Sequence, residues 1–355
     1  MSLPAKLIAA VVDPPRGCAD LPDVGGVIRA RLDDFVVEEL PAYESDGRPG
    51  HLLLTLKKRG LTTEEALGQL SRRLQVPRAE IGLAGLKDRD AVTRQRVSVP
   101  DRAAAALAGF SHPNIELGEP EPHSHKLRRG HLRGNRFAIT IRGTKLPPDE
   151  ALRHAKAKLE QIERDGLRNY YGAQRFGNDG RNLAPGLAAL AGKGPPRAKA
   201  DLVVSAGQSA LFNLYLAERA ERGLLGTVML GDILQKRETG GMFECSDPAE
   251  DQRRLDAGEL SITGPMFGSK MRRPSPGTPS DALESEVLEL AGLARAKLDK
   301  LGRKVPGARR PLLIRPEQVT VELAPEVAGL GPGLELRFVL PPGSYATVLV
   351  RELCG

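Results

Sequence analysis

Residues 82–99 read GLAGLKDRDAVTRQRVSV, a charged turn followed by a segment with the alternation of a strand. Its two glycines allow a tight backbone path, and four charged residues follow at 87–90. Beyond them, Val97 and Val99 alternate with polar residues, which predicts a half-buried strand that carries the charged turn at its start. A carboxylate held beside cations in such a turn stays ionised and can act as a nucleophile or a base.

Asp88 is the candidate catalytic carboxylate of this turn, and the pattern alone leaves two roles open for it. It fits a reactive group, and it equally fits a residue that orders the turn by accepting backbone N–H groups. Asp90 lies two residues further on, and on a strand both carboxylates would face the same way. That spacing also permits a two-carboxylate glycosidase, although no other feature of the sequence supports one.

The composition indicates a globular, basic protein. The 355 residues suffice for one large domain or two, and a net charge of +7 with few aromatic residues suits a polyanionic partner. Three cysteines, odd in number and far apart, give neither a disulfide framework nor a zinc spacing, so we expect a reducing, cytoplasmic environment. No apolar run approaches the length of a membrane span, and no membrane partner is expected.

Residues 122–148 form a basic segment without any acidic residue. Such a density of cations repels itself unless an anion lies nearby, although a solvated charged loop is the alternative. The candidate RNA contacts of this segment are Lys126, Arg128, Arg129 and Arg133. Its three histidines could be imagined as metal ligands, but the neighbouring cations oppose a metal ion, so no metal site is expected.

Residues 169–177, NYYGAQRFG, combine aromatic rings with amide and guanidinium groups. This composition can stack on bases and hold phosphates, which makes Asn169, Gln174 and Arg175 candidate RNA contacts. Aromatic residues are also common in protein cores, so the segment is ambiguous when taken alone.

The spacing of apolar residues predicts further elements. Strands are expected as a pair within 26–39 and at 51–56, 136–142, 319–323 and 334–340. Helices are expected from a Thr62–Glu65 capping box to Pro77, at 209–222, at 281–298, and from a Ser344 cap to Leu353. Another helix is expected from Pro147 to Gly166, with Leu152, Ala155, Leu159 and Ile162 on one face.

Together these stretches resemble the tRNA pseudouridine synthase D (TruD) family. Residues 83–95 resemble its AG-x-KD-x-x-AVT-x-Q block, residues 133–137 its GN-x-F block, and residues 169–177 its NY-[FY]-G-x-QRFG block. Further similar blocks lie at 34–38, 205–219, 343–347 and 350–353. The blocks follow the family's order and cover nearly the whole chain.

The resemblance implies an α+β fold and a set of site residues. The fold would be a pseudouridine synthase catalytic core with a mainly antiparallel sheet, 1–165 and 318–355, interrupted by a TruD insertion domain, 166–317. The Asp of the family's Lys-Asp pair is catalytic and corresponds to Asp88. The positions implied near the substrate are Arg29, Phe35, Lys87, Asn135, Phe137 and Tyr345.

The resemblance further implies an isomerase that converts uridine to pseudouridine in tRNA, at position 13, on a nucleotide flipped out of the RNA. This reaction has no net redox change and consumes no water, so no cofactor is expected. The expected partner is tRNA, with no obligate protein partner. Two other functions remain open: a non-catalytic RNA-binding or RNA-folding factor in which Asp88 is structural, and a hydrolase that releases free base.

Overall fold

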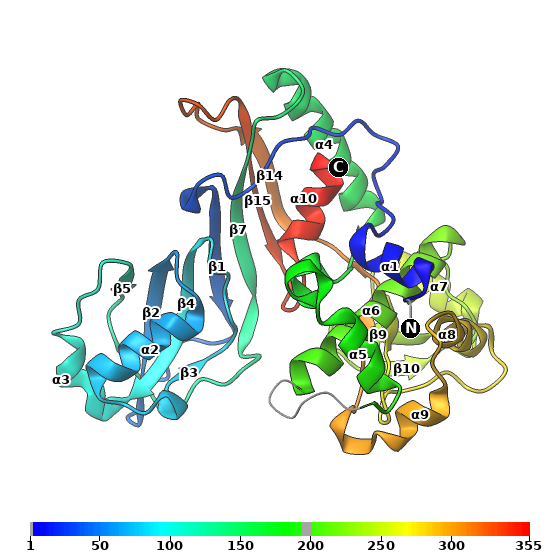
Figure 1. Cartoon of the computed structure of the whole chain (residues 1–355), viewed down its shortest axis with the longest axis horizontal. Helices are drawn as coiled ribbons and strands as arrows, with labels where there is room; N and C mark the ends of the chain where they lie inside the picture. Colours follow the sequence, from blue (N-terminus) through cyan, green and yellow to red (C-terminus); the bar gives the residue numbers. More distant parts are fainter. Residues whose placement is uncertain (1–2, 194–199) are drawn as a thin grey trace. The chain divides into compact units, whose positions relative to one another are not determined.

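The structure is a computed structural model that describes residues 3–193 and 200–355 (Figure 1). The chain forms two compact units, which we call the sheet unit and the insertion unit. The sheet unit comprises Asp20–Glu160, Pro316–Ala346 and Leu353–Gly355. The insertion unit comprises the chain up to Ala19, Gln161–Arg315 and Thr347–Glu352. The insertion unit thus takes in the start of the chain and part of the last helix, in addition to the middle of the sequence.

The sheet unit is built around one large sheet. Its strands are β1 (Phe35–Pro41), β2 (His51–Arg59), β3 (Gly82–Leu83), β4 (Val92–Pro100), β5 (Ile115–Leu117), β6 (Glu121–His123), β7 (Leu132–Arg142), β14 (Glu317–Leu323) and β15 (Gly333–Leu340). The order is β14-β15-β7-β1-β4-β2-β5, with β3 beside β4 and β6 beside β2. Only β1 and β4 run parallel among these pairs. The predicted α+β class with a mainly antiparallel sheet is confirmed.

The helix that follows β2 forms as its sequence predicts. The Thr62 hydroxyl accepts a hydrogen bond from the Glu65 backbone and the Glu65 carboxylate accepts one from the Thr62 backbone, so α2 (Thr63–Leu74) begins with a capping box. Its buried leucines pack with Val97 and Val99 of β4. The helix ends at Leu74, before Pro77, because Gln75 adopts a left-handed φ of 54°.

Some predicted elements were wrong in place or exposure. Within 26–39 only β1 forms a strand: Val27 makes a single bridge to Arg142, and a 3-10 helix occupies Leu32–Asp34. The expected half-buried strand, β4, is buried along most of its length because it lies between β1 and β2. The expected 281–298 helix is two helices, α8 (Pro279–Leu290) and α9 (Arg295–Lys300), separated at Gly292 with a φ of 68°.

The helix expected after Pro147, α4 (Pro148–Asp165), buries a face that matches the predicted one only in part, with Ala155 and Ile162 buried as expected. Leu152 and Leu159 are only half-buried, whereas Lys158 is fully buried. The Lys158 ammonium pairs with Asp23 at 2.5 Å, so a charged residue occupies a position that the apolar spacing did not predict. The last helix, α10 (Ala346–Cys354), begins two residues after Ser344, which places Tyr345 rather than Ser344 at the position before its first turn.

The insertion unit packs helices around a small sheet. The helices are α1 (Ala5–Val12), α5 (Leu183–Leu190), α6 (Ala200–Glu221), α7 (Pro248–Asp256), α8 and α9. The strands are β9 (Ile233–Lys236), β10 (Met242–Glu244), β11 (Leu260–Met266) and β12 (Ala308–Pro311), in the order β10-β9-β11-β12, and a separate pair, β8 (Leu167–Arg168) with β13 (Leu313–Ile314).

Helix α6 is the centre of this unit, and its apolar residues from Ala206 to Ala217 are buried, whereas Leu202 near its start is 51% exposed. It approaches α5 closely at Gly207, where a Cβ on Gly186 would lie 2.6 Å from the Gly207 backbone nitrogen. No helix within residues 3–193 and 200–355 is long and apolar enough to cross a membrane.

Candidate active site

The turn that carries Asp88 lies between β3 and β4 in the sheet unit, and its backbone is held from several sides. Gly82 is required for this path, because a Cβ there would lie 2.4 Å from the Leu127 carbonyl oxygen. The Lys87 backbone N–H donates to Thr63 Oγ1 at 2.9 Å. The Asp88 carbonyl oxygen accepts a hydrogen bond of 2.6 Å from Lys58 Nζ. The backbone of the turn is therefore fixed in place, and the side chains of Asp88, Arg89 and Asp90 are exposed.

The Asp88 carboxylate is paired with Arg29. Arg29 Nη2 lies 3.2 Å from Asp88 Oδ2, and the Asp88 side chain is 43% exposed. The Arg29 guanidinium also lies 4.2 Å from the centre of the Phe35 ring. Arg29 has a φ of 62°, a left-handed conformation that costs a residue with a side chain about 1–2 kcal/mol. Strain of this kind clusters at functional sites, where the surrounding fold enforces it.

Three phenylalanines continue from Arg29 into the sheet. The Phe35 and Phe137 rings meet edge to face with centroids 6.4 Å apart, and Phe137 stacks on Phe338 at 5.1 Å. The sequence did not single out Phe338, although it continues the alternation of buried residues on β15. Asp88, Arg29, Phe35 and Phe137 thus form one connected set of contacts.

Lys87 does not face solvent. Its Nζ lies 2.5 Å from Glu39 Oε2, and both side chains are almost fully buried. The other Glu39 oxygen accepts the Arg96 backbone N–H at 3.1 Å. Glu39, which the sequence did not single out, therefore anchors the residue that precedes Asp88 to the end of β1.

Asn135 lies directly opposite Glu39 in the antiparallel β1–β7 pair. Its side-chain Oδ1 is buried and has no hydrogen-bond partner within the described part of the chain. An unsatisfied buried acceptor costs about 1–3 kcal/mol, so a group that donates to it would be bound favourably. The N–H groups of a uracil ring are donors of this kind.

Lys58 is a third residue of the site that the sequence did not single out, after Phe338 and Glu39. It is completely buried, and its Nζ donates to the carbonyl oxygens of Leu61 and Asp88, both at 2.6 Å. Burial lowers the pKa of Lys58 to about 8. Tyr345, the other aromatic candidate, is half-buried in the loop that precedes α10.

The basic segment of the sheet unit exposes most of its cations. Arg128, Arg129 and Arg133 are exposed, whereas Lys126 is half-buried and its Nζ donates to the Ala79 carbonyl oxygen. Two of the histidines contact Tyr43: its ring stacks on His123 at 5.3 Å, and its hydroxyl lies 2.8 Å from His131 Nδ1. Across residues 3–193 and 200–355 no group of three His, Cys, Asp or Glu side chains could hold a metal ion.

The candidate RNA contacts of 169–177 belong to the insertion unit, and each of them forms a hydrogen bond within it. Asn169 is 4% exposed, and its Nδ2 donates to the Pro311 carbonyl oxygen at 2.9 Å. Arg175 Nε donates to Ser209 Oγ at 3.0 Å, and its guanidinium lies over the Tyr171 ring. Gln174 is exposed, and its Oε1 accepts a hydrogen bond from Thr347.

Known proteins similar to this chain share its length and its fold. The tRNA pseudouridine synthase D (TruD) family matches residues 16–184 and 187–353. A tRNA pseudouridine synthase D of Anaeromyxobacter dehalogenans (strain 2CP-C) is 41% identical over 97% of both chains. One of Thermus thermophilus is 44% identical over 94% of this chain and 90% of its own. A crystal structure under the TruD name from Methanosarcina mazei has the same fold, with a TM-score of 0.79 at 24% identity over 100% of this chain and 98% of its own.

The α+β fold and these relatives define an isomerase of the pseudouridine synthase class. The chain belongs to the tRNA pseudouridine synthase D (TruD) family, as the resemblance of its sequence blocks predicted.

Proposed function

We propose that this protein converts uridine to pseudouridine in tRNA, at position 13, and that Asp88 is its catalytic carboxylate. Membership of the TruD family supports the reaction and the class of substrate. The observation that carries the assignment of Asp88 is its pairing with Arg29, whose backbone the fold holds in a strained conformation beside an aromatic ring. A turn residue that only accepted backbone N–H groups would not require this arrangement.

The reaction breaks the bond from ribose C1′ to N1 of the base and forms a bond from C1′ to C5. The C5 proton is released, and N1 gains a proton, so atoms and charges balance without oxidant, reductant or water. Asp88 can drive this exchange by attacking C1′ or by promoting a glycal-like species, and both routes use the same carboxylate. In either route Arg29 orients the carboxylate toward the sugar through the hydrogen bond between them.

The detached uracil must rotate without leaving the site. An aromatic face tolerates rotation of a stacked ring in its own plane, and we assign this role to Phe137 and Tyr345. The Asn135 amide would follow the polar edge of the base, which fits a buried oxygen without a partner in the described part of the chain. Phe35 would act through Arg29, and Lys87 would hold the turn through Glu39.

The target uridine has to leave the folded RNA before Asp88 can reach its sugar. We assign phosphate contacts around the flipped nucleotide to Lys126, Arg128, Arg129 and Arg133, most of which are exposed. In the insertion unit we assign a direct RNA contact to Gln174, because its side chain is exposed. Asn169 and Arg175 would act indirectly, by ordering the backbone around Gln174. We place the activity in the cytoplasm, which suits three cysteines without disulfides.

The Asp88→Asn variant tests this proposal, with Asp90→Asn as the matched control. Both substitutions remove one carboxylate from the same exposed turn. We expect Asp88→Asn to abolish pseudouridine formation while tRNA affinity stays within about twofold, and Asp90→Asn to keep activity. Equal activity of the Asp88→Asn variant and the wild type would overturn the assignment and favour an RNA-binding protein with a structural Asp88.

A further inference from the structure

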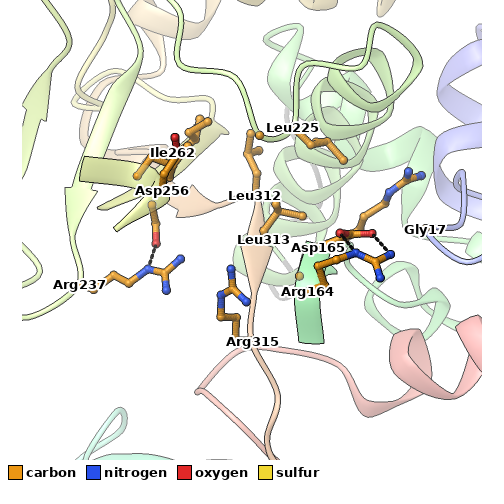
Figure 2. A pocket seen from close by; sticks show the side chains of 15 residues that line it. Gly17, Arg164, Asp165, Leu225, Arg237, Asp256, Ile262, Leu312, Leu313 and Arg315 are labelled. Atoms are coloured by element: carbon orange, nitrogen blue, oxygen red, sulfur yellow. Dashed lines mark hydrogen bonds and ion pairs between the residues drawn. The ribbon is translucent and has the colours of Figure 1, made fainter. Parts of the chain in front are cut away.

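The insertion unit contains a pocket lined by arginines that the proposed chemistry does not use. The pocket has a volume of about 490 Å³ and lies where β8 pairs with β13 (Figure 2). Volumes of about 300–1,000 Å³ are typical of sites that enclose a small organic ligand. The charged residues that line it are Arg164, Asp165, Arg168, Arg237, Asp256 and Arg315.

The protein balances the positive charge of this pocket only in part, because four arginines line it against two aspartates, Asp165 and Asp256. Arg164 uses its guanidinium on Asp165, with Nε 2.9 Å from the carboxylate. Arg168, Arg237 and Arg315 form no ion pair within the described part of the chain. Figure 2 shows the Arg237 and Arg315 guanidinium groups pointing into the same space, and the charge of Arg315 adds to burial in lowering the pKa of Arg237. Two cations held close together are stabilised by an anion between them.

The three unpaired arginines are nevertheless fixed in position. Arg168 Nη1 donates to the Pro15 carbonyl oxygen at 2.8 Å, and Arg315 Nη1 donates to the Glu163 carbonyl oxygen. Arg237 Nε donates to the Leu260 carbonyl oxygen at 3.0 Å. Each bond uses one of the five N–H donors of a guanidinium and leaves others for a ligand. Arginines anchored in this way lose little further side-chain entropy when they bind an anion.

The remaining wall of the pocket is apolar, which argues for a ligand larger than a bare anion. The lining includes Leu225, Leu255, Ile262, Leu312 and Leu313. An apolar wall facing fixed guanidinium groups matches a nucleotide, whose base and ribose have apolar surface and whose phosphate is anionic.

We propose that this pocket binds a nucleotide of the tRNA away from the reacting uridine, with the phosphate on Arg237 and Arg315. The proposal rests on the proposed function for the identity of the RNA. On this proposal the insertion unit binds RNA, and its contacts increase the affinity for tRNA without taking part in the exchange of the C1′–N1 bond for the C1′–C5 bond.

The double variant Arg237→Gln/Arg315→Gln tests this site, with Arg253→Gln as the control. Arg253 lies on α7 of the same unit, is 71% exposed and does not line the pocket. We expect the double variant to bind tRNA about tenfold more weakly and the slope of log affinity against log salt to fall by about one. Turnover at saturating tRNA should stay unchanged, and the control should match the wild type throughout.

Two further measurements keep the test decisive. The first is binding of uridine monophosphate to the wild type and to the double variant, which distinguishes a tRNA site from a site for free nucleotides. If the double variant lost uridine monophosphate binding but kept the tRNA affinity of the wild type, the proposal would be overturned. If the double variant is unstable, hydrogen exchange of the wild type decides instead. Bound tRNA should then protect the backbone amides of 164–168 and 312–315, and absence of protection would overturn the proposal. Because these readouts measure binding, they stand even if the wild type forms no pseudouridine.

Discussion

Arg29 Nη2 lies 3.2 Å from Asp88 Oδ2, although 59 positions separate the two residues in the sequence. The contact depends on the only parallel pair in the described part of the large sheet, because β1 follows Arg29 and β4 follows Asp88. With both strands starting from the same edge, the segments that precede them meet. The proposed catalytic pair is therefore a consequence of strand direction in this sheet.

Arg29→Ala should impair catalysis more than binding. Without its partner the Asp88 carboxylate samples other rotamers, and misplacement of a reacting group by about 1 Å can reduce the rate about 100-fold. We expect a loss of this size in kcat, with tRNA affinity changed severalfold at most. Arg31→Ala, which removes a nearby exposed arginine paired with Asp33, serves as the control. A loss confined to tRNA affinity would mean that Arg29 binds phosphate instead.

Breaking the buried Glu39–Lys87 pair should destabilise the fold. Glu39→Gln leaves the Lys87 ammonium without a counter-charge in a buried place, which costs about 3–5 kcal/mol. Glu116→Gln breaks the exposed Lys57–Glu116 pair and should cost less than about 1 kcal/mol. Urea unfolding of the two variants measures both values. Similar losses in the two variants would show that Glu39 and Lys87 are not paired in a dry interior.

Lys58 should make stability rise with pH. Its pKa is about 8 in the folded protein against 10.5 for the ordinary side chain. Below pH 8 both states hold the proton, and between about pH 8 and 10.5 only the unfolded chain keeps it, so the free energy of unfolding increases across that window. We expect the wild type to gain about 3 kcal/mol relative to Lys58→Met over this range. Lys57→Met, which alters the exposed neighbour, should have the same pH dependence of the free energy of unfolding as the wild type.

Phe137→Leu should separate packing from catalysis. Leucine keeps an apolar side chain against Phe35 and Phe338, so we expect a stability loss of about 1–2 kcal/mol. It lacks the flat face proposed to hold the rotating uracil, and kcat should fall by about tenfold or more. Ile139→Leu, a buried change further along β7, should cost similar stability and leave kcat unaltered. Equal kcat in the two variants would exclude Phe137 from the stack.

The sequence pattern predicted those elements whose structure depends on residues close together in the sequence. The capping box of α2 and most of the strands around the charged turn were predicted because alternation and capping are local signals. The prediction of β2 ended at Leu56 because three cations follow, yet the strand continues to Arg59. Lys58 shares the alternation of Leu54 and Leu56, and this signal could have revealed its buried position.

Other parts of the site depend on contacts that no local pattern contains. Glu39 continues the alternation of Phe35 and Val37, but its partner Lys87 lies 48 positions away. The arginine pocket combines residues from β8, the loop after β9 and the chain after β13, which only the folded insertion unit brings together. The proposed catalytic turn was located by the family resemblance, and the arginine pocket was found only in the structure.

The central claim is tested most directly by mapping the product in tRNA treated with the purified wild-type protein. We predict that one uridine, at position 13, becomes its C5-linked isomer with no change in mass, and that no free uracil appears. Release of uracil would indicate a hydrolase. Unchanged uridine at every position, with tRNA still bound, would contradict an isomerase built on Asp88.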